Sequence, residues 1–87
     1  MAYPETLSEK RMAAIVSVAN DIASEPSNTE NHIRRMGIAR TLLNGGGPLD
    51  TYITIDFAVQ GYDSSTPFND IKTRLSSLIT NFIALGF

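Results

Sequence analysis

The stretch NGGGPLDTYITIDFAVQGY, residues 44–62, decides the fold predicted from this sequence. In its second half, apolar residues recur at every second position: Ile53, Ile55, Phe57 and Val59. Successive side chains of a β-strand point to opposite faces, so this period is typical of a strand with one buried and one solvated face. The sequence therefore predicts a strand over residues 51–60.

The three glycines before this segment raise the question of phosphate binding. Phosphate loops run from a strand through glycines into a helix, whose N-terminal amides face the ligand. Here the glycines follow a predicted helix and precede a predicted strand, and Pro48 has no amide hydrogen to donate. Residues 45–47 are therefore predicted to end a helix and to form a flexible joint.

A first helix is predicted to begin near Leu7 and to end at Glu25. Thr6 and Glu9 have the spacing of a capping box, and Pro26 pushes the residue before it out of the helical conformation. Its predicted inner face consists of Met12, Ile15, Val16, Ala19, Ile22 and Ala23.

Two further helices are predicted. One follows a second capping-box pattern at residues 27–30, ends at Asn44, and has the inner residues Ile33, Met36, Ala39, Leu42 and Leu43. The short turn before it predicts that the first two helices are antiparallel. The last helix has Thr66 as its N-cap, Pro67 in its first turn and Gly86 at its end. Its apolar stripe consists of Phe68, Ile71, Leu75, Leu78, Ile79 and Phe82.

The predicted order is helix, helix, strand, helix, which gives a single α+β (ααβα) domain over residues 1–87. A lone strand leaves backbone groups unpaired, and each such group costs ~1–3 kcal/mol when it is buried. A second strand could come from residues 2–7, where Pro4 would confine it to an edge. It could also come from a second molecule that adds its own strand, and we expect this intermolecular pairing.

Composition narrows the possible functions. The 87 residues contain no cysteine, so oligomerisation is the remaining common device for stabilising so small a fold. A formal net charge of -2 argues against general nucleic-acid binding. No apolar run approaches the ~20 residues of a membrane helix, and no leader is apparent, so a soluble, unprocessed chain is expected.

Few residues suggest catalysis. His32 is the single histidine, and without cysteine it cannot complete a common zinc set. As a general base it would need a nucleophile and an orienting group. Ser64, Ser65 or Asp63 can be nominated for these roles, but nothing in their spacing favours them. His32 is interpreted as a surface residue and Asp56 as an unpaired charge at a strand edge. The sequence predicts no enzymatic activity, no cofactor and no bound metal.

The predicted strand and the C-terminal segment supply a predicted interface with a protein partner. The last thirteen residues, LSSLITNFIALGF, contain no charged side chain. Either a partner covers their apolar surface, or Phe87 folds back as the hydrophobic contact of a C-cap at Gly86. The predicted interface comprises Tyr52, Ile53, Thr54, Ile55, Phe57, Val59, Tyr62, Phe82, Leu85 and Phe87.

Arg34, Arg35 and Arg40 form the densest basic cluster of the sequence. Guanidinium groups bind phosphate and carboxylate well, so an anion or an acidic partner surface could dock there. Alternatively, Glu30 precedes Arg34 by four residues and forms an ordinary surface ion pair with it.

These features together predict a non-enzymatic assembly subunit that acts through protein–protein contacts, as a homo-oligomer or as part of a larger assembly. A phage or virus particle is the expected setting, with the chain as a cement or connector protein located in the virion or the host cytoplasm. One alternative is a small accessory or inhibitor protein that binds a host protein. Another is an oligomeric binder of an anionic small molecule through the arginine-containing helix.

Overall fold

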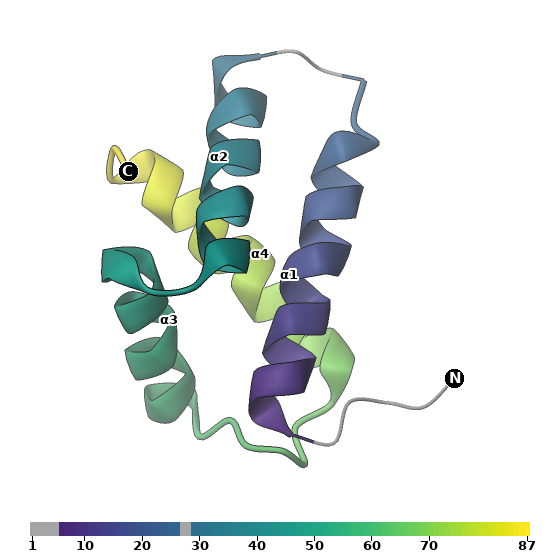
Figure 1. Ribbon diagram of the computed structural model, residues 1–87, viewed down its shortest axis with the longest axis vertical. Coiled ribbons are helices and arrows are strands. Elements are labelled where there is room, and N and C mark those ends of the chain that lie inside the picture. The colour runs from purple at the N-terminus through teal and green to yellow at the C-terminus, as the bar shows by residue number, and fades with distance from the viewer. Residues whose placement is uncertain (1–5, 27–28) are drawn as a thin grey trace.

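The structure is a computed structural model, and it describes residues 6–26 and 29–87. This part of the chain contains four helices. They are α1 (Leu7–Ala23), α2 (Glu30–Asn44), α3 (Gly47–Gln60) and α4 (Phe68–Ala84). Helices α1 and α2 lie side by side and antiparallel, and α4 crosses behind both of them (Figure 1). Helix α3 stands beside this group, joined to α2 by a short glycine turn.

The predicted α+β class is wrong, because residues 6–26 and 29–87 contain no strand and residues 51–60 are helical. Besides its two-residue alternation, this segment has apolar residues at four-residue intervals: Leu49, Ile53 and Phe57. That interval places all three side chains on one face of a helix. A helix also pairs its backbone groups internally, so the need for a partner strand disappears. The alternative prediction, a strand over residues 2–7, is wrong at Leu7, because this residue begins α1. Residues 2–5 lie outside the described part.

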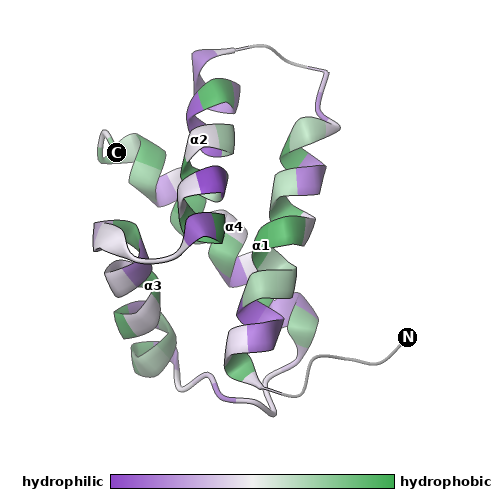
Figure 2. Ribbon diagram, in the orientation of Figure 1, coloured by the Kyte–Doolittle hydropathy of each residue, from purple (hydrophilic) through white to green (hydrophobic). Residues whose placement is uncertain are grey.

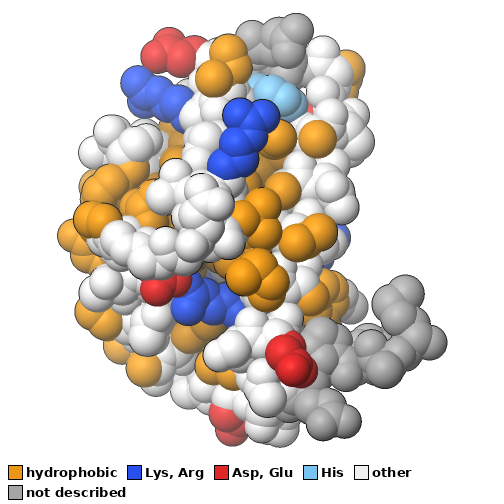
Figure 3. All heavy atoms as spheres, in the orientation of Figure 1, with side chains coloured by type: hydrophobic (Ala, Val, Ile, Leu, Met, Phe, Trp, Pro, Cys, Tyr) orange, Lys and Arg blue, Asp and Glu red, His pale blue; other side chains and the backbone are white. Residues whose placement is uncertain are grey.

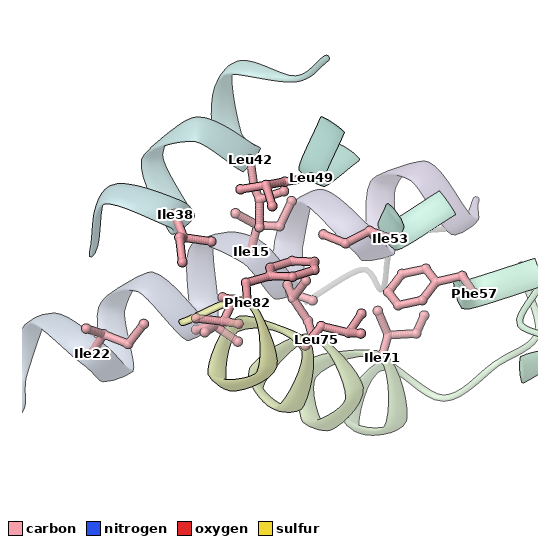
Figure 4. Packing of buried hydrophobic residues seen from close by; sticks show 14 residues of the cluster. Ile15, Ile22, Ile38, Leu42, Leu49, Ile53, Phe57, Ile71, Leu75 and Phe82 are labelled. Carbon is pink, nitrogen blue, oxygen red and sulfur yellow. The ribbon is translucent and has the colours of Figure 1, made fainter. Parts of the chain in front are cut away.

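Buried side chains from all four helices form one hydrophobic core. In Figure 4, Leu49, Ile53 and Phe57 point from α3 into this core, where Phe57 faces Ile71 of α4. The backbones of α1, α2 and α4 approach one another closely, whereas that of α3 stands further off. Helix α3 is therefore attached mainly through side chains. The core comprises Ala14, Ile15, Val18, Ile22, Ile38, Leu42, Leu49, Ile53, Phe57, Ile71, Leu75, Leu78, Ile79 and Phe82.

The N-terminal caps were partly predictable. The capping box of α1 is confirmed, because Thr6 Oγ1 accepts from the Glu9 amide (3.1 Å) and the Glu9 carboxylate accepts from the Thr6 amide (3.4 Å). Thr29 caps α2 by accepting from the His32 amide at 3.3 Å; Ser27 and Asn28 of the predicted box lie outside the described residues. Thr66 does not cap α4, since its hydroxyl accepts from the Asp63 amide at 2.9 Å instead.

The predicted inner faces of α1 and α2 are partly wrong. Met12, Val16, Ala23 and Ile33 are exposed, and Ala14, Val18 and Ile38 are buried in addition to the correctly predicted residues. Both helices are thus turned about their axes relative to the prediction, because several faces of each carry apolar residues (Figure 2). The stripe of α4 is confirmed, with Phe68 partly buried and its other members buried.

Helix α3 ends in a Schellman motif, which the sequence prediction missed. Gly61 has the left-handed conformation (φ 75°, ψ 25°), and the Tyr62 amide donates to the Phe57 carbonyl at 2.9 Å. The rings of Phe57 and Tyr62 pack with their centroids 5.3 Å apart, which is the hydrophobic contact of this motif. Gly61 therefore ends a helix here rather than starting a loop after a strand.

Helix α4 ends in the same way. Gly86 has φ 91°, and the Phe87 amide donates to the Phe82 carbonyl at 3.0 Å, with ring centroids 5.7 Å apart. The alternative that Phe87 folds back onto a glycine C-cap is thus confirmed. The six-residue endings FAVQGY and FIALGF share an aromatic residue, a glycine and a second aromatic residue at the same spacing.

Lys10 fixes the loop between α3 and α4. Its side chain is buried, and its Nζ donates to the carbonyl oxygens of Ser64 and Thr66, the latter at 2.6 Å. Both carbonyls belong to the loop, outside any helix, and they accept hydrogen bonds from the ammonium group of Lys10. Lys10 therefore ties the loop to α1.

We expect opposite effects from two glycine substitutions. Gly61→Ala should lower the free energy of unfolding by about 1 kcal/mol, because alanine is strained at positive φ. Gly37→Ala should raise it by about 0.5–1 kcal/mol, because this glycine lies inside α2 with open space around it. Urea unfolding measures both values. A stabilising Gly61→Ala would contradict the left-handed end of α3.

Lys10→Met should lower the free energy of unfolding by roughly 2 kcal/mol, since two loop carbonyls lose a charged donor. Lys72→Met is the matched control. Lys72 pairs with Asp21 at 2.8 Å near the surface, so its loss should cost less than about 1 kcal/mol. Equal losses in thermal or urea unfolding would show that Lys10 does not fix the loop.

Candidate functional site

Helix α3 has a second apolar stripe that faces away from the core. Tyr52, Ile55 and Val59 follow one another at three- and four-residue intervals and are 50%, 56% and 77% exposed. The alternation in the sequence therefore reflects a helix with apolar residues on two faces. A soluble helix normally has a polar outer face, so this stripe is a candidate contact surface.

The C-terminal end of α4 extends this surface. Leu85 and Phe87 are 76% and 45% exposed, and together with the outer stripe of α3 they border a groove of about 450 Å³ between the two helices. Hydrophobic side chains are visible along the side of the molecule where α3 and the end of α4 lie (Figure 3). We call this surface the α3–α4 groove; it is lined by Tyr52, Ile55, Asp56, Val59, Arg74, Leu78, Asn81, Phe82, Leu85 and Phe87.

Three aromatic rings join the two sides of the groove. The ring centroid of Tyr52 lies 5.8 Å from that of Phe87 and 6.4 Å from that of Phe82. Phe87 meets Phe82 edge to face across the helix end described above. Aromatic pairs at such distances attract one another beyond their burial, so these contacts help to hold this end of the groove together.

A bidentate ion pair connects the two helices in the same groove. Arg74 Nε donates to Asp56 Oδ2 at 2.8 Å, and Arg74 Nη2 donates to Asp56 Oδ1. The hydrogen bond from Arg74 lowers the pKa of Asp56, and the same bond raises the pKa of Arg74. The interpretation of Asp56 as an unpaired edge charge is therefore wrong. The side chains that line the groove have no net charge, because Asp56 and Arg74 are its charged members and they neutralise each other.

The structure brings six of the ten predicted interface residues together in the groove: Tyr52, Ile55, Val59, Phe82, Leu85 and Phe87. Of these six, Phe82 is buried and belongs to the core, and the other five are exposed. Ile53 and Phe57 are buried in the core, so they are not available to a partner. Tyr62 packs against Phe57 at the end of α3. Thr54 lies on another face, where its hydroxyl donates to the Asp50 carbonyl at 3.0 Å.

A second ion pair holds the start of α3 against α1. Arg11 pairs with Asp50, and its guanidinium also donates to Thr54 Oγ1 at 3.4 Å. Partial burial lowers the pKa of Arg11, although an arginine remains charged at neutral pH. The sequence prediction missed this contact, because the two residues lie far apart along the chain.

The arginine cluster does not converge on one point. Arg34 pairs with Glu30 at 3.2 Å, as the surface-pair alternative predicts, and Arg35 Nη1 lies 3.7 Å from Glu25 Oε2. Both arginines border a shallow hollow with Asn31 and Thr80. Arg40 is exposed and is not part of the lining of this hollow.

His32 is half-buried rather than a plain surface residue. Its Nδ1 lies 3.8 Å from Glu25 Oε2, the same oxygen that Arg35 approaches. Among the described residues, no group of three or more His, Asp or Glu side chains is arranged to hold a metal ion. Within residues 6–26 and 29–87, no helix has the length and apolar character needed to span a membrane.

Residues 63–65, nominated as possible catalytic partners of His32, form a turn in the loop before α4. The Asp63 carboxylate accepts from the Ser65 hydroxyl at 2.6 Å and from the Ser65 amide at 2.9 Å. These hydrogen bonds lower the pKa of Asp63. The Ser65 hydroxyl thus donates to a carboxylate of the same loop, and this hydrogen bond explains where the Ser65 side chain lies.

Comparison of the chain with protein-family models, with curated proteins and with solved structures gives no match.

The Asp56–Arg74 pair should make the free energy of unfolding depend on pH. Because folding lowers the pKa of Asp56, the pair stabilises the fold above the unfolded-state pKa, and this contribution disappears as pH falls through the lowered folded-state pKa. Asp56→Asn should therefore cost about 1 kcal/mol at pH 7 and much less below about pH 3. Urea unfolding of both proteins at the two pH values measures this; an unchanged difference would contradict the ion pair.

Proposed function

We propose that this chain is a non-enzymatic interaction subunit that binds protein through the α3–α4 groove. The single observation that supports this most is the convergence of five exposed apolar side chains from α3 and from the residues that follow α4: Tyr52, Ile55, Val59, Leu85 and Phe87. Single exposed hydrophobic residues are ordinary, but a contiguous group bordering a groove is typical of contact surfaces.

The geometry of the groove supports tight packing with a partner. Its aromatic end is held by ring contacts between Tyr52, Phe82 and Phe87 and by the Schellman motif at Gly86. Side chains that are already ordered lose little conformational freedom on binding. Buried aromatic anchors contribute much of the binding free energy in protein interfaces.

The chemistry of the groove favours protein over other partners. Its lining has no net charge and few polar groups, so it offers little to phosphate or to a nucleic acid. The arginine-based alternatives have weaker support, since Arg34 and Arg35 each already face a glutamate. The expectation of a phage or virus particle depended chiefly on the unpaired strand. That strand is a helix, and nothing in the described residues supports a viral setting.

Photo-crosslinking tests this proposal. We would replace Tyr52 with p-benzoylphenylalanine in the full chain and irradiate the cells that naturally make it. We expect an adduct of one discrete mass from position 52, and its loss when Val59→Glu is added, because a buried charge opposes apolar contact. The same crosslinker at Ile33, an exposed apolar position on α2, is the control. Absence of an adduct, or equal adducts from both positions, would contradict the proposed function.

A further inference from the structure

We propose that the occupant of the α3–α4 groove is a second copy of this chain, paired about a twofold axis with α3 against α3. This inference rests on the proposed function and specifies its partner. Three features of the described residues support it: the charge of the surface, its area and the arrangement of the outer stripe of α3.

Charge favours a copy of the same surface. In a twofold pair, each group faces its own equivalent or a neighbour of it, so a charged patch would repel itself. In this groove Asp56 and Arg74 neutralise each other through two hydrogen bonds, and the other lining residues are uncharged. Residues 75–87 likewise contain no charged side chain. The lining side chains of two copies can therefore approach without like-charge repulsion, whereas a strongly charged foreign partner would find no complementary charge.

The exposed area fits a small dimer. The five exposed residues that border the groove leave roughly 500 Å² of surface open, since their exposed fractions together equal about three whole residues of ~150–250 Å² each. Two such surfaces together reach about 1,000 Å², which is near the lower limit for a specific interface. The total accessible surface of the chain is 5400 Å², so one such patch is close to the ~10% that a small protein typically buries in a partner.

The outer stripe of α3 has the form that helix pairing requires. Tyr52, Ile55 and Val59 form a single row along about 10 Å of helix axis, with Ile55 in the middle. The neighbouring exposed residues on α3 are uncharged: Thr51, Ala58 and Gln60. When the twofold axis runs along the two helices, each residue of this row lies opposite its own equivalent in the partner. Ile55 and Val59 are therefore expected to lie opposite their copies in the partner.

Solution mass provides the first test. We expect light scattering of the purified full chain to show, at tens to hundreds of micromolar, a mass approaching twice the 9.5 kDa of one chain. Val59→Glu and, separately, Leu85→Glu should weaken this association roughly tenfold or more, because each places a charge in an apolar contact. Ile33→Glu is the matched control and should leave the association unchanged. Circular dichroism confirms that each variant is folded, and both positions in the groove are exposed enough to accept glutamate in a monomer.

Charge reversal at one position tests the twofold arrangement. Val59→Glu and Val59→Lys should each be monomeric when alone, because like charges meet near the axis. Mixed in equal amounts, they should form a heterodimer, because opposite charges then meet. Failure of the mixture to associate, when the unsubstituted chain is dimeric, would overturn pairing of α3 with α3.

Single cysteines provide an independent readout, because the natural chain contains none. Ile55→Cys or Val59→Cys should form disulfide-linked dimers under mild oxidation, whereas Ile33→Cys should remain largely reduced. A chain that is monomeric at hundreds of micromolar and shows no disulfide at position 55 or 59 would overturn the inference. If position 52 still crosslinks to a different protein in cells, the proposed function stands and the partner is foreign. If neither association nor crosslinking is observed, both proposals fail.

Discussion

Helix α3 has apolar side chains on two of its faces, and the rest of the structure depends on this property. The inner face places Leu49, Ile53 and Phe57 in the core, where each buried side chain contributes on the order of 1.5–3 kcal/mol. The backbone of α3 stands further from the other helices, so these side chains are its main attachment. Two ion pairs, Arg11–Asp50 and Asp56–Arg74, fix its rotation. With the inner face fixed, the outer stripe must face solvent or a partner.

The ends of α3 and α4 relate the fold to the candidate site. Both helices stop at a left-handed glycine followed by an aromatic residue that folds back onto a phenylalanine five positions earlier. At the end of α3 this arrangement completes the core with Tyr62. At the end of α4 it instead places Phe87 against Tyr52, which closes one end of the groove. The same local motif thus stabilises the core in one place and forms a surface in the other.

Much of the fold could be predicted from sequence, because local signals specify it. The capping box at Thr6, the capping-box pattern at residues 27–30 and the apolar stripe of α4 locate three helices. Residues 51–60 could not be assigned from periodicity, since two-residue and four-residue spacings coexist there. Pro48 in the first turn and the five-residue separation of Phe57 and Tyr62 across Gly61 were the available signals for a helix. The rotations of α1 and α2 escaped prediction because apolar residues such as Met12 and Ile33 lie on their outer faces.

The two-residue alternation marks the candidate site, but a strand assigns its residues to the wrong faces. A strand would place Ile53, Ile55 and Val59 on one face, whereas the helix buries Ile53 and exposes the other two. The charged contacts escaped prediction because tertiary packing brings their partners together. Thiol labelling of Ile53→Cys, Ile55→Cys and Val59→Cys at low micromolar concentration tests the two-faced helix most directly. Slow reaction at position 53 and fast reaction at positions 55 and 59 are expected; similar protection at all three positions would contradict it.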